Sequence, residues 1–108
     1  MNTNLFVYGT LRSDQDNSWS RFLKAEASLI GRGTVAAALQ QVGRYTGMVA
    51  DLDSGANVCG EVHQIREPER VFKVLDEYEG SDYERAVTRV TMEDGRTIES
   101  WAYFYRAV

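Results

Sequence analysis

The stretch AVTRVTMEDGRTIESWAYF, residues 86–104, predicts a β-hairpin. Apolar and polar side chains alternate with a period of two on both sides of Asp94-Gly95, as they do in strands that bury one face. Asp-Gly is a favoured pair for a two-residue hairpin turn, because such a turn needs residues that accept a positive φ angle. We therefore expect two antiparallel strands joined at Asp94-Gly95.

Three further segments predict strands that enlarge this hairpin into a sheet. Residues 5–8 form an apolar and aromatic run that leads into a loop, and residues 57–65 place small and apolar side chains on one side at period two. Residues 28–41 are apolar but are interrupted by Gly31 and Gly33, which favours a bent strand. A helix is the alternative for this third segment, because its three consecutive alanines tolerate one.

Two helices are expected between the strands. Three apolar side chains between residues 19 and 23 recur at the spacing i, i+3 and i+4, behind the potential capping residues Asn17-Ser18. Residues 67–69 (EPE) are typical of a helix start, and Gly80 is typical of a helix end. The whole pattern predicts an α+β fold with a curved or barrel-like β-sheet and two flanking helices.

The composition predicts a single domain that spans residues 1–108 and excludes several classes of protein. A net charge of −4 argues against nucleic acid as a partner, because binding to phosphates depends on Lys and Arg. No stretch approaches the roughly 20 apolar residues of a membrane span, and the N-terminus lacks the pattern of a secretory signal. We therefore expect a cytoplasmic protein without a membrane anchor, either a monomer or a homodimer.

Single copies of cysteine and histidine limit the chemistry further. Cys59 alone cannot form an intrachain disulfide, and with His63 alone no Cys/His zinc cluster can form. The run from Asp51 to Gly55 begins like a calcium loop, but Val62 stands where the loop's last acidic ligand belongs. We expect a turn there, and no metal.

The most informative residue of the second helix is Glu79. At about 100° per residue, Glu79 falls among the apolar side chains, between Phe72 and Leu75, whereas Glu77 points to the polar side. Burial of a carboxylate raises its pKa toward the range that suits proton transfer at neutral pH. The alternative is that the last turn unwinds and leaves Glu79 in solvent or paired with Arg85.

The loop after the first strand is a candidate binding site. Residues 7–12 (VYGTLR) combine the end of a strand with a glycine that lets a ligand approach the backbone. Consecutive exposed N–H groups in such a loop can hold a carboxylate or an oxyanion. By itself the pattern is also that of an ordinary turn.

Taken together, four segments resemble the γ-glutamyl cyclotransferase-like family. They are FVYGTLR at 6–12, GEV at 60–62, LDEYEG at 75–80 and YER at 83–85. The resemblance extends from Leu5 to Tyr105 and is closest to the γ-glutamylamine cyclotransferases and their short bacterial relatives. It implies a small mixed β-barrel with flanking helices and an enzyme that needs no cofactor.

The resemblance also implies roles for individual residues. The family's catalytic acid/base is the glutamate before the glycine, which corresponds to Glu79. Its substrate loop, which binds the γ-glutamyl end of a small-molecule substrate, corresponds to Tyr8, Gly9, Thr10 and Leu11, and Tyr83 is expected to border the same pocket. The chain departs from the family pattern at Thr46, where proline is frequent, and at His63, where an aromatic residue is frequent. We expect both changes to reshape the leaving-group side of the substrate pocket and to leave the catalytic pattern intact.

Several alternatives to a cyclotransferase stay open. The same fold could serve as a binding module without catalysis, or Glu79 could activate water in a γ-glutamyl hydrolase. Glu79 could also be structural, paired with Arg85 or Arg89. Cys59 and His63 share a strand face, so they could form a nucleophile–base pair, but we expect a packed thiol and a half-buried imidazole.

Overall fold

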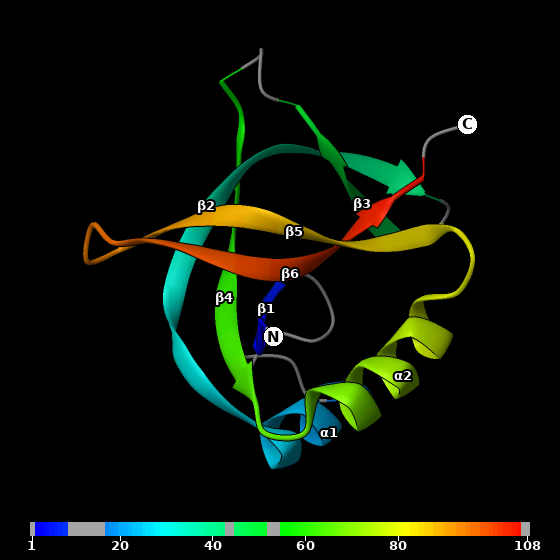
Figure 1. Ribbon diagram of the computed structural model, residues 1–108. Helices are drawn as coiled ribbons and strands as arrows, with labels where there is room; N and C mark the ends of the chain where they lie inside the picture. The colour runs from blue at the N-terminus through cyan, green and yellow to red at the C-terminus, as the bar shows by residue number, and fades with distance from the viewer. Residues whose placement is uncertain (1, 9–16, 43–44, 52–54, 107–108) are drawn as a thin grey trace.

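The structure is a computed structural model that describes residues 2–8, 17–42, 45–51 and 55–106. These residues form two helices and six strands (Figure 1). In chain order the elements are β1 (Asn4–Val7), α1 (Ser18–Glu26), β2 (Ala27–Val42), β3 (Tyr45–Ala50), β4 (Asn57–Ile65), α2 (Pro68–Glu79), β5 (Tyr83–Met92) and β6 (Thr97–Tyr105).

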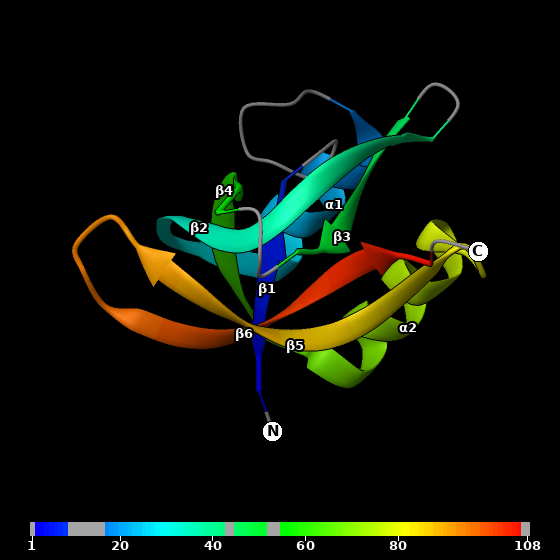
Figure 2. The same ribbon diagram turned by 90° about the horizontal axis from the view of Figure 1, so that it is seen from above.

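The strands form one mixed sheet that closes into a barrel (Figure 2). The order is β3-β2-β4-β1-β6-β5, and a further pairing of β2 with β5 completes the ring. The pairing between β1 and β6 is parallel, whereas the others are antiparallel. Both helices lie on the same side of the barrel (Figure 1). The predicted α+β fold with a barrel-like sheet and two helices is confirmed.

Strand β2 closes the barrel because it is long enough to pair with two different strands along one edge. Gly33 and Thr34 pair with β5, and residues 37–42 pair with β3. A register shift between Leu29 and Gly31 bends the strand where β4 pairs on the other edge. The prediction of a bent strand for 28–41 is therefore confirmed, and the helical alternative is wrong.

Two hydrophobic cores lie on opposite sides of the barrel wall. Strand β1 contributes to both, since Phe6 points into the barrel while Leu5 and Val7 point toward the helices. The barrel core also holds Val35, Ala37, Met48, Val58, Val62, Val90, Met92 and Ala102. The core beneath the helices also holds Leu23, Ala27, Ile65, Val71, Phe72, Leu75 and Tyr103.

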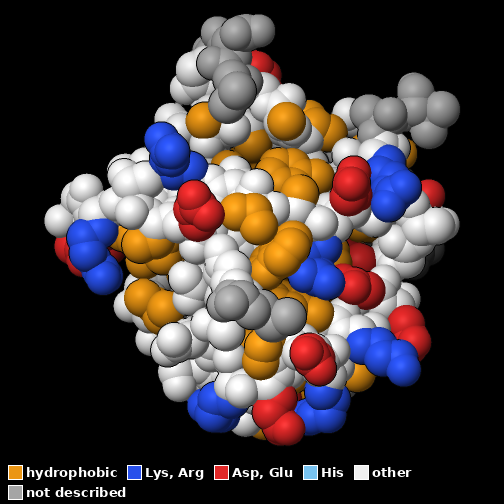
Figure 3. Space-filling view, viewed as in Figure 1, with side chains coloured by type: hydrophobic (Ala, Val, Ile, Leu, Met, Phe, Trp, Pro, Cys, Tyr) orange, Lys and Arg blue, Asp and Glu red, His pale blue; other side chains and the backbone are white. Residues whose placement is uncertain are grey.

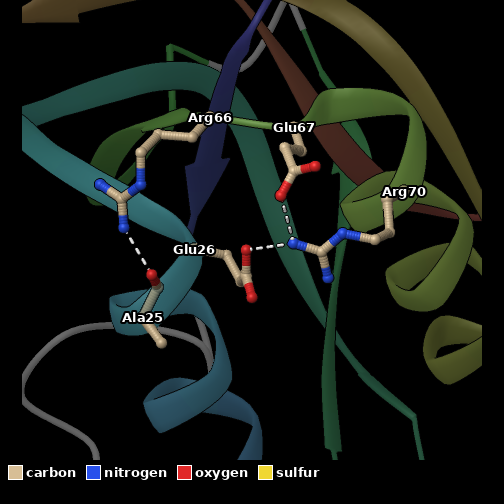
Figure 4. Close-up of polar contacts among 5 residues, drawn as sticks. All are labelled: Ala25, Glu26, Arg66, Glu67 and Arg70. Carbon is tan, nitrogen blue, oxygen red and sulfur yellow. Dashed lines mark hydrogen bonds and ion pairs between the residues drawn. The ribbon is translucent and has the colours of Figure 1, made fainter.

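The helices begin where the sequence predicts, and an ion pair joins them. Asn17 caps α1 through a reciprocal pair of hydrogen bonds with Ser20, and Pro68 occupies the first turn of α2. Arg70 of α2 reaches Glu26 of α1 at 2.5 Å and Glu67 at 2.8 Å (Figure 4). No helix in the described ranges is long and apolar enough to cross a membrane.

The hairpin turn differs from the prediction by one residue. The backbone N–H of Met92 donates to the carbonyl of Arg96, so three residues, 93–95, form the loop in place of two. Gly95 adopts φ 92°, and its N–H donates to the carbonyl of Met92. This arrangement is typical of a three-residue hairpin loop, in which only the last residue needs a positive φ angle. The strands themselves form as predicted.

Candidate active site

Glu79 is the last residue of α2, on the side of the helix that faces the protein. Gly80 ends the helix with φ 78°, and its N–H donates to the carbonyl of Asp76 at 3.0 Å. The Glu79 side chain is half-buried, whereas Glu77 is exposed. Burial raises the pKa of Glu79 from 4.5 to about 7. The helix phase predicted from the sequence is therefore confirmed.

Nothing in the described part of the chain compensates the burial of Glu79. No hydrogen bond or ion pair to its carboxylate occurs among these residues, and desolvation is the cause of its raised pKa. Arg85, the partner considered in the alternative, binds Asp76 through Nε at 2.9 Å and Nη2 at 3.3 Å. An uncompensated carboxylate with a pKa near neutrality can both accept and return a proton.

Three tyrosines lie within the electrostatic field of Glu79. Burial raises the pKa of Tyr8, Tyr83 and Tyr103, and the negative charge of Glu79 contributes to the rise in each case. Tyr8 comes from the end of β1, Tyr83 from the start of β5 and Tyr103 from β6. The C-terminal end of α2 therefore meets three strands at a tyrosine-rich region.

The sequence prediction named five residues besides Glu79, and the structure describes two of them. Tyr8 and Tyr83 both lie near Glu79, and the ring of Tyr83 packs edge-on against Tyr105 at 5.7 Å. Gly9, Thr10 and Leu11 lie outside the described residues. The anion-binding loop thus stays a prediction.

The hydroxyl group of Tyr8 is held by the backbone of two other strands. It donates to the carbonyl of Tyr103 in β6 at 2.9 Å and accepts from the N–H of Met48 in β3 at 2.9 Å. The two bonds fix the ring at the end of β1, directly before the predicted substrate loop. Tyr8 therefore has a structural function in addition to any contact with substrate.

Asp76, Arg85 and Tyr103 form a polar cluster that the sequence analysis missed. The Asp76 side chain is 45% exposed, yet it accepts hydrogen bonds from Arg85 and from Tyr103. Partial burial opposes its ionisation, but the hydrogen bonds from Arg85 and Tyr103 outweigh burial and lower the pKa of Asp76. The observed hairpin register places Arg85 directly opposite Tyr103. The two-residue turn expected from the sequence would have placed Arg85 opposite Phe104, so the sequence pattern held no signal for this cluster.

Cys59 and His63 do not form the nucleophile–base pair considered above, and their predicted burial is wrong. Cys59 is exposed, and the His63 side chain is only 2% exposed. His63 Nε2 lies 3.2 Å from Glu61 Oε1, inside the protein. The imidazole tolerates full burial because Glu61 is buried with it and binds one of its nitrogens.

Comparison with known proteins identifies the family. The family model described as gamma-glutamyl cyclotransferase, AIG2-like, matches residues 5–108. The chain belongs to this family. The AIG2-like domain therefore covers all the segments that carry the resemblance in the sequence.

Individual relatives of this AIG2-like protein agree with the family model. A Methanocaldococcus jannaschii protein, MJ1514, provisionally named a γ-glutamylcyclotransferase, is 29% identical over 105 residues, which cover 94% of this chain and 82% of that protein. An AIG2-like protein from mouse superposes with a TM-score of 0.79 at 25% identity, over 98% of this chain and 78% of the mouse chain. Bacillus subtilis YkqA superposes with a TM-score of 0.78 at 26% identity over 98% of this chain, which spans only 36% of YkqA.

Proposed function

We propose that the protein is a cytoplasmic enzyme that releases 5-oxoproline and a free amine from a γ-glutamyl amine or peptide. The observation that carries the proposal is the half-buried carboxylate of Glu79, which has no hydrogen-bond or ion-pair partner among the described residues and has a pKa raised to about 7. Glu79 stands directly before Gly80, the position for which the sequence resemblance implies the acid/base role. The tyrosine-rich surroundings agree with a pocket for a small molecule.

The proposed reaction is an intramolecular acyl transfer. The α-amine of the substrate attacks its own γ-carbonyl carbon, so a C–N bond forms in the five-membered ring and the bond to the attached amine breaks. The α-ammonium loses one proton to become the attacking amine and a second one when the ring nitrogen becomes an amide N–H. Glu79 accepts these protons in turn and passes them to the departing nitrogen, which leaves as an ammonium ion. No oxidant or reductant is consumed, and the two protons that leave one nitrogen arrive on the other.

One carboxylate is enough for this chemistry because the nucleophile and the electrophile belong to the same molecule. Well-oriented intramolecular reactions reach effective molarities of about 10⁵ to 10⁸ M. The remaining need is proton transfer, to which a positioned acid/base contributes a factor of about 10² to 10⁴. The pocket has to hold the substrate folded back on itself, which is the task we assign to Tyr8, Gly9, Thr10, Leu11 and Tyr83.

The test is a panel of γ-glutamyl amines and γ-glutamyl dipeptides, with release of 5-oxoproline as the readout. We expect 5-oxoproline from at least one substrate, and a loss of at least about 100-fold in Glu79→Gln. Glu77→Gln is the matched control, since its carboxylate is exposed on the same helix and its loss should leave turnover unchanged.

Other results of the panel would replace the proposal. Release of glutamate without 5-oxoproline would make the protein a γ-glutamyl hydrolase. Thermal stabilisation by a γ-glutamyl compound without any turnover would indicate a binding module. Full activity in Glu79→Gln would remove Glu79 from the chemistry.

A further inference from the structure

The cluster of Asp76, Arg85 and Tyr103 joins the last turn of α2 to the β5–β6 hairpin. Arg85 donates two hydrogen bonds to the Asp76 carboxylate, and the Tyr103 hydroxyl donates a third at 2.6 Å. Arg85 and Tyr103 face each other across the two strands. One carboxylate therefore binds both strands of the hairpin at the same level.

The guanidinium group of Arg85 also lies over two aromatic rings. Its central carbon lies 4.3 Å from the ring centre of Phe72 and 4.4 Å from that of Trp101. The same residues line an open groove of about 420 Å³ between α2 and the hairpin, beside the hydrophobic side chains that gather over β5 and β6 in Figure 3. A cation that contacts two aromatic rings and donates two hydrogen bonds is more constrained than an ordinary surface ion pair.

Asp76 lies one helical turn before Glu79. Its side chain binds the hairpin, and its backbone carbonyl accepts the N–H of Gly80 that ends the helix. On the opposite side of this turn the ring of Tyr78 packs against Trp19 of α1 at 4.2 Å. The last turn of α2, which carries Glu79, therefore contacts α1 on one side and the β5–β6 hairpin on the other.

We propose that Asp76 is a positioning residue, which Arg85 and Tyr103 hold so that the last turn of α2 presents Glu79 to the pocket near Tyr8 and Tyr83. The inference rests on the proposed function for its kinetic consequence. Its structural part, the place of Glu79, does not depend on any activity. Tyr103 connects the cluster to the pocket as well, since its carbonyl accepts the hydroxyl of Tyr8.

The decisive experiment measures the pKa of Glu79 by carbon-13 NMR titration of the side-chain carboxyl, with Glu79→Gln to assign the signal. In Arg85→Gln the two possible effects have opposite signs. Loss of a nearby positive charge alone would raise the pKa of a carboxylate. Loosening of the turn would admit water and lower the pKa of Glu79 from about 7 toward 4.5. We expect a fall of about one pH unit or more.

Tyr103→Phe separates position from charge, because it removes the hydrogen bond to Asp76 and leaves every charge in place. The same fall in the pKa of Glu79 is expected there. Arg70→Gln is the matched control, since Arg70 also forms exposed ion pairs on α2 but at the helix's other end. Circular dichroism tests whether each variant is folded. If Arg85→Gln does not fold, the pKa of Glu79 in Tyr103→Phe decides the question.

The kinetic readout is kcat, which should fall between about 10- and 100-fold in Asp76→Asn, Arg85→Gln and Tyr103→Phe, with a smaller change in KM. The inference is overturned if the pKa of Glu79 rises in Arg85→Gln or stays constant in a folded Tyr103→Phe. If the unaltered protein releases no 5-oxoproline at all, the proposed function fails, while the titrations still decide whether Asp76 positions Glu79.

Discussion

The hydroxyl oxygen of Tyr8 lies 2.9 Å from the carbonyl oxygen of Tyr103, to which it donates a hydrogen bond. The parallel pairing of β1 with β6 brings the end of β1 to this position. The same hydroxyl accepts the N–H of Met48, so a single side chain connects β1, β6 and β3 beside Glu79. Residues 9–11, which the sequence predicts to bind substrate, follow Tyr8 directly and thus start from a fixed point.

Tyr8→Phe should therefore lower the stability of the protein. The substitution leaves the carbonyl of Tyr103 and the N–H of Met48 without their partner, which costs about 1 to 3 kcal/mol of the free energy of unfolding. Denaturant titration measures the loss. Tyr83→Phe is the control, because the Tyr83 hydroxyl has no hydrogen bond with the described residues and its removal should change stability by less than about 0.5 kcal/mol. Equal losses in the two variants would contradict this account of Tyr8.

Glu79 should make the protein less stable as the pH rises. Its pKa is about 7 in the folded state and near 4.5 in the unfolded state, so the folded state holds this proton more tightly. The resulting stabilisation is complete below pH 4.5 and is lost as the pH rises through 7. The pKa difference corresponds to at most about 3 kcal/mol, and the partial exposure of Glu79 makes the real figure smaller.

Denaturant titrations at pH 5 and pH 8 test this linkage. The decrease in the free energy of unfolding between the two pH values should be smaller in Glu79→Gln than in the unaltered protein. Glu77→Gln, which removes an exposed carboxylate two residues away, should retain the full decrease. An identical pH dependence in Glu79→Gln and the unaltered protein would show that the carboxylate is not desolvated.

The rate of the proposed reaction should rise with pH, as expected when Glu79 acts as a base. Glu79 must be ionised to accept the proton of the α-ammonium, so kcat/KM should rise with pH and reach half of its plateau near pH 7. This rise of kcat/KM with pH should be absent from the residual activity of Glu79→Gln and unchanged in Glu77→Gln. If the midpoint of the rise lies near pH 4.5, the group that ionises is a solvated carboxylate and not Glu79.

Local patterns in the sequence predicted both helices, the described strands other than β3, and the direction of Glu79, because these follow from the period of a helix or a strand. Strand β3 (Tyr45–Ala50) was not predicted. The phase of α2 alone separates Glu79 from Glu77. What the patterns did not reveal depends on contacts between distant segments. The cluster around Asp76 needs α2 to meet the hairpin, and the burial of His63 depends on its pairing with Glu61.

The close approach of β4 to β1 is another feature that depends on contacts between distant segments, and it makes a final prediction about two glycines. A β-carbon on Gly60 would lie 2.4 Å from the carbonyl oxygen of Val7 and 2.6 Å from the ring of Phe6. Backbone cannot yield at that distance, so Gly60→Ala should cost about 3 kcal/mol or more. A β-carbon on Gly31 would meet only the flexible end of Met92, at 3.2 Å, so Gly31→Ala should cost less than about 1 kcal/mol. Thermal unfolding of both variants compares the two sites, and a Gly60→Ala protein as stable as Gly31→Ala would mean that β1 and β4 are farther apart than described.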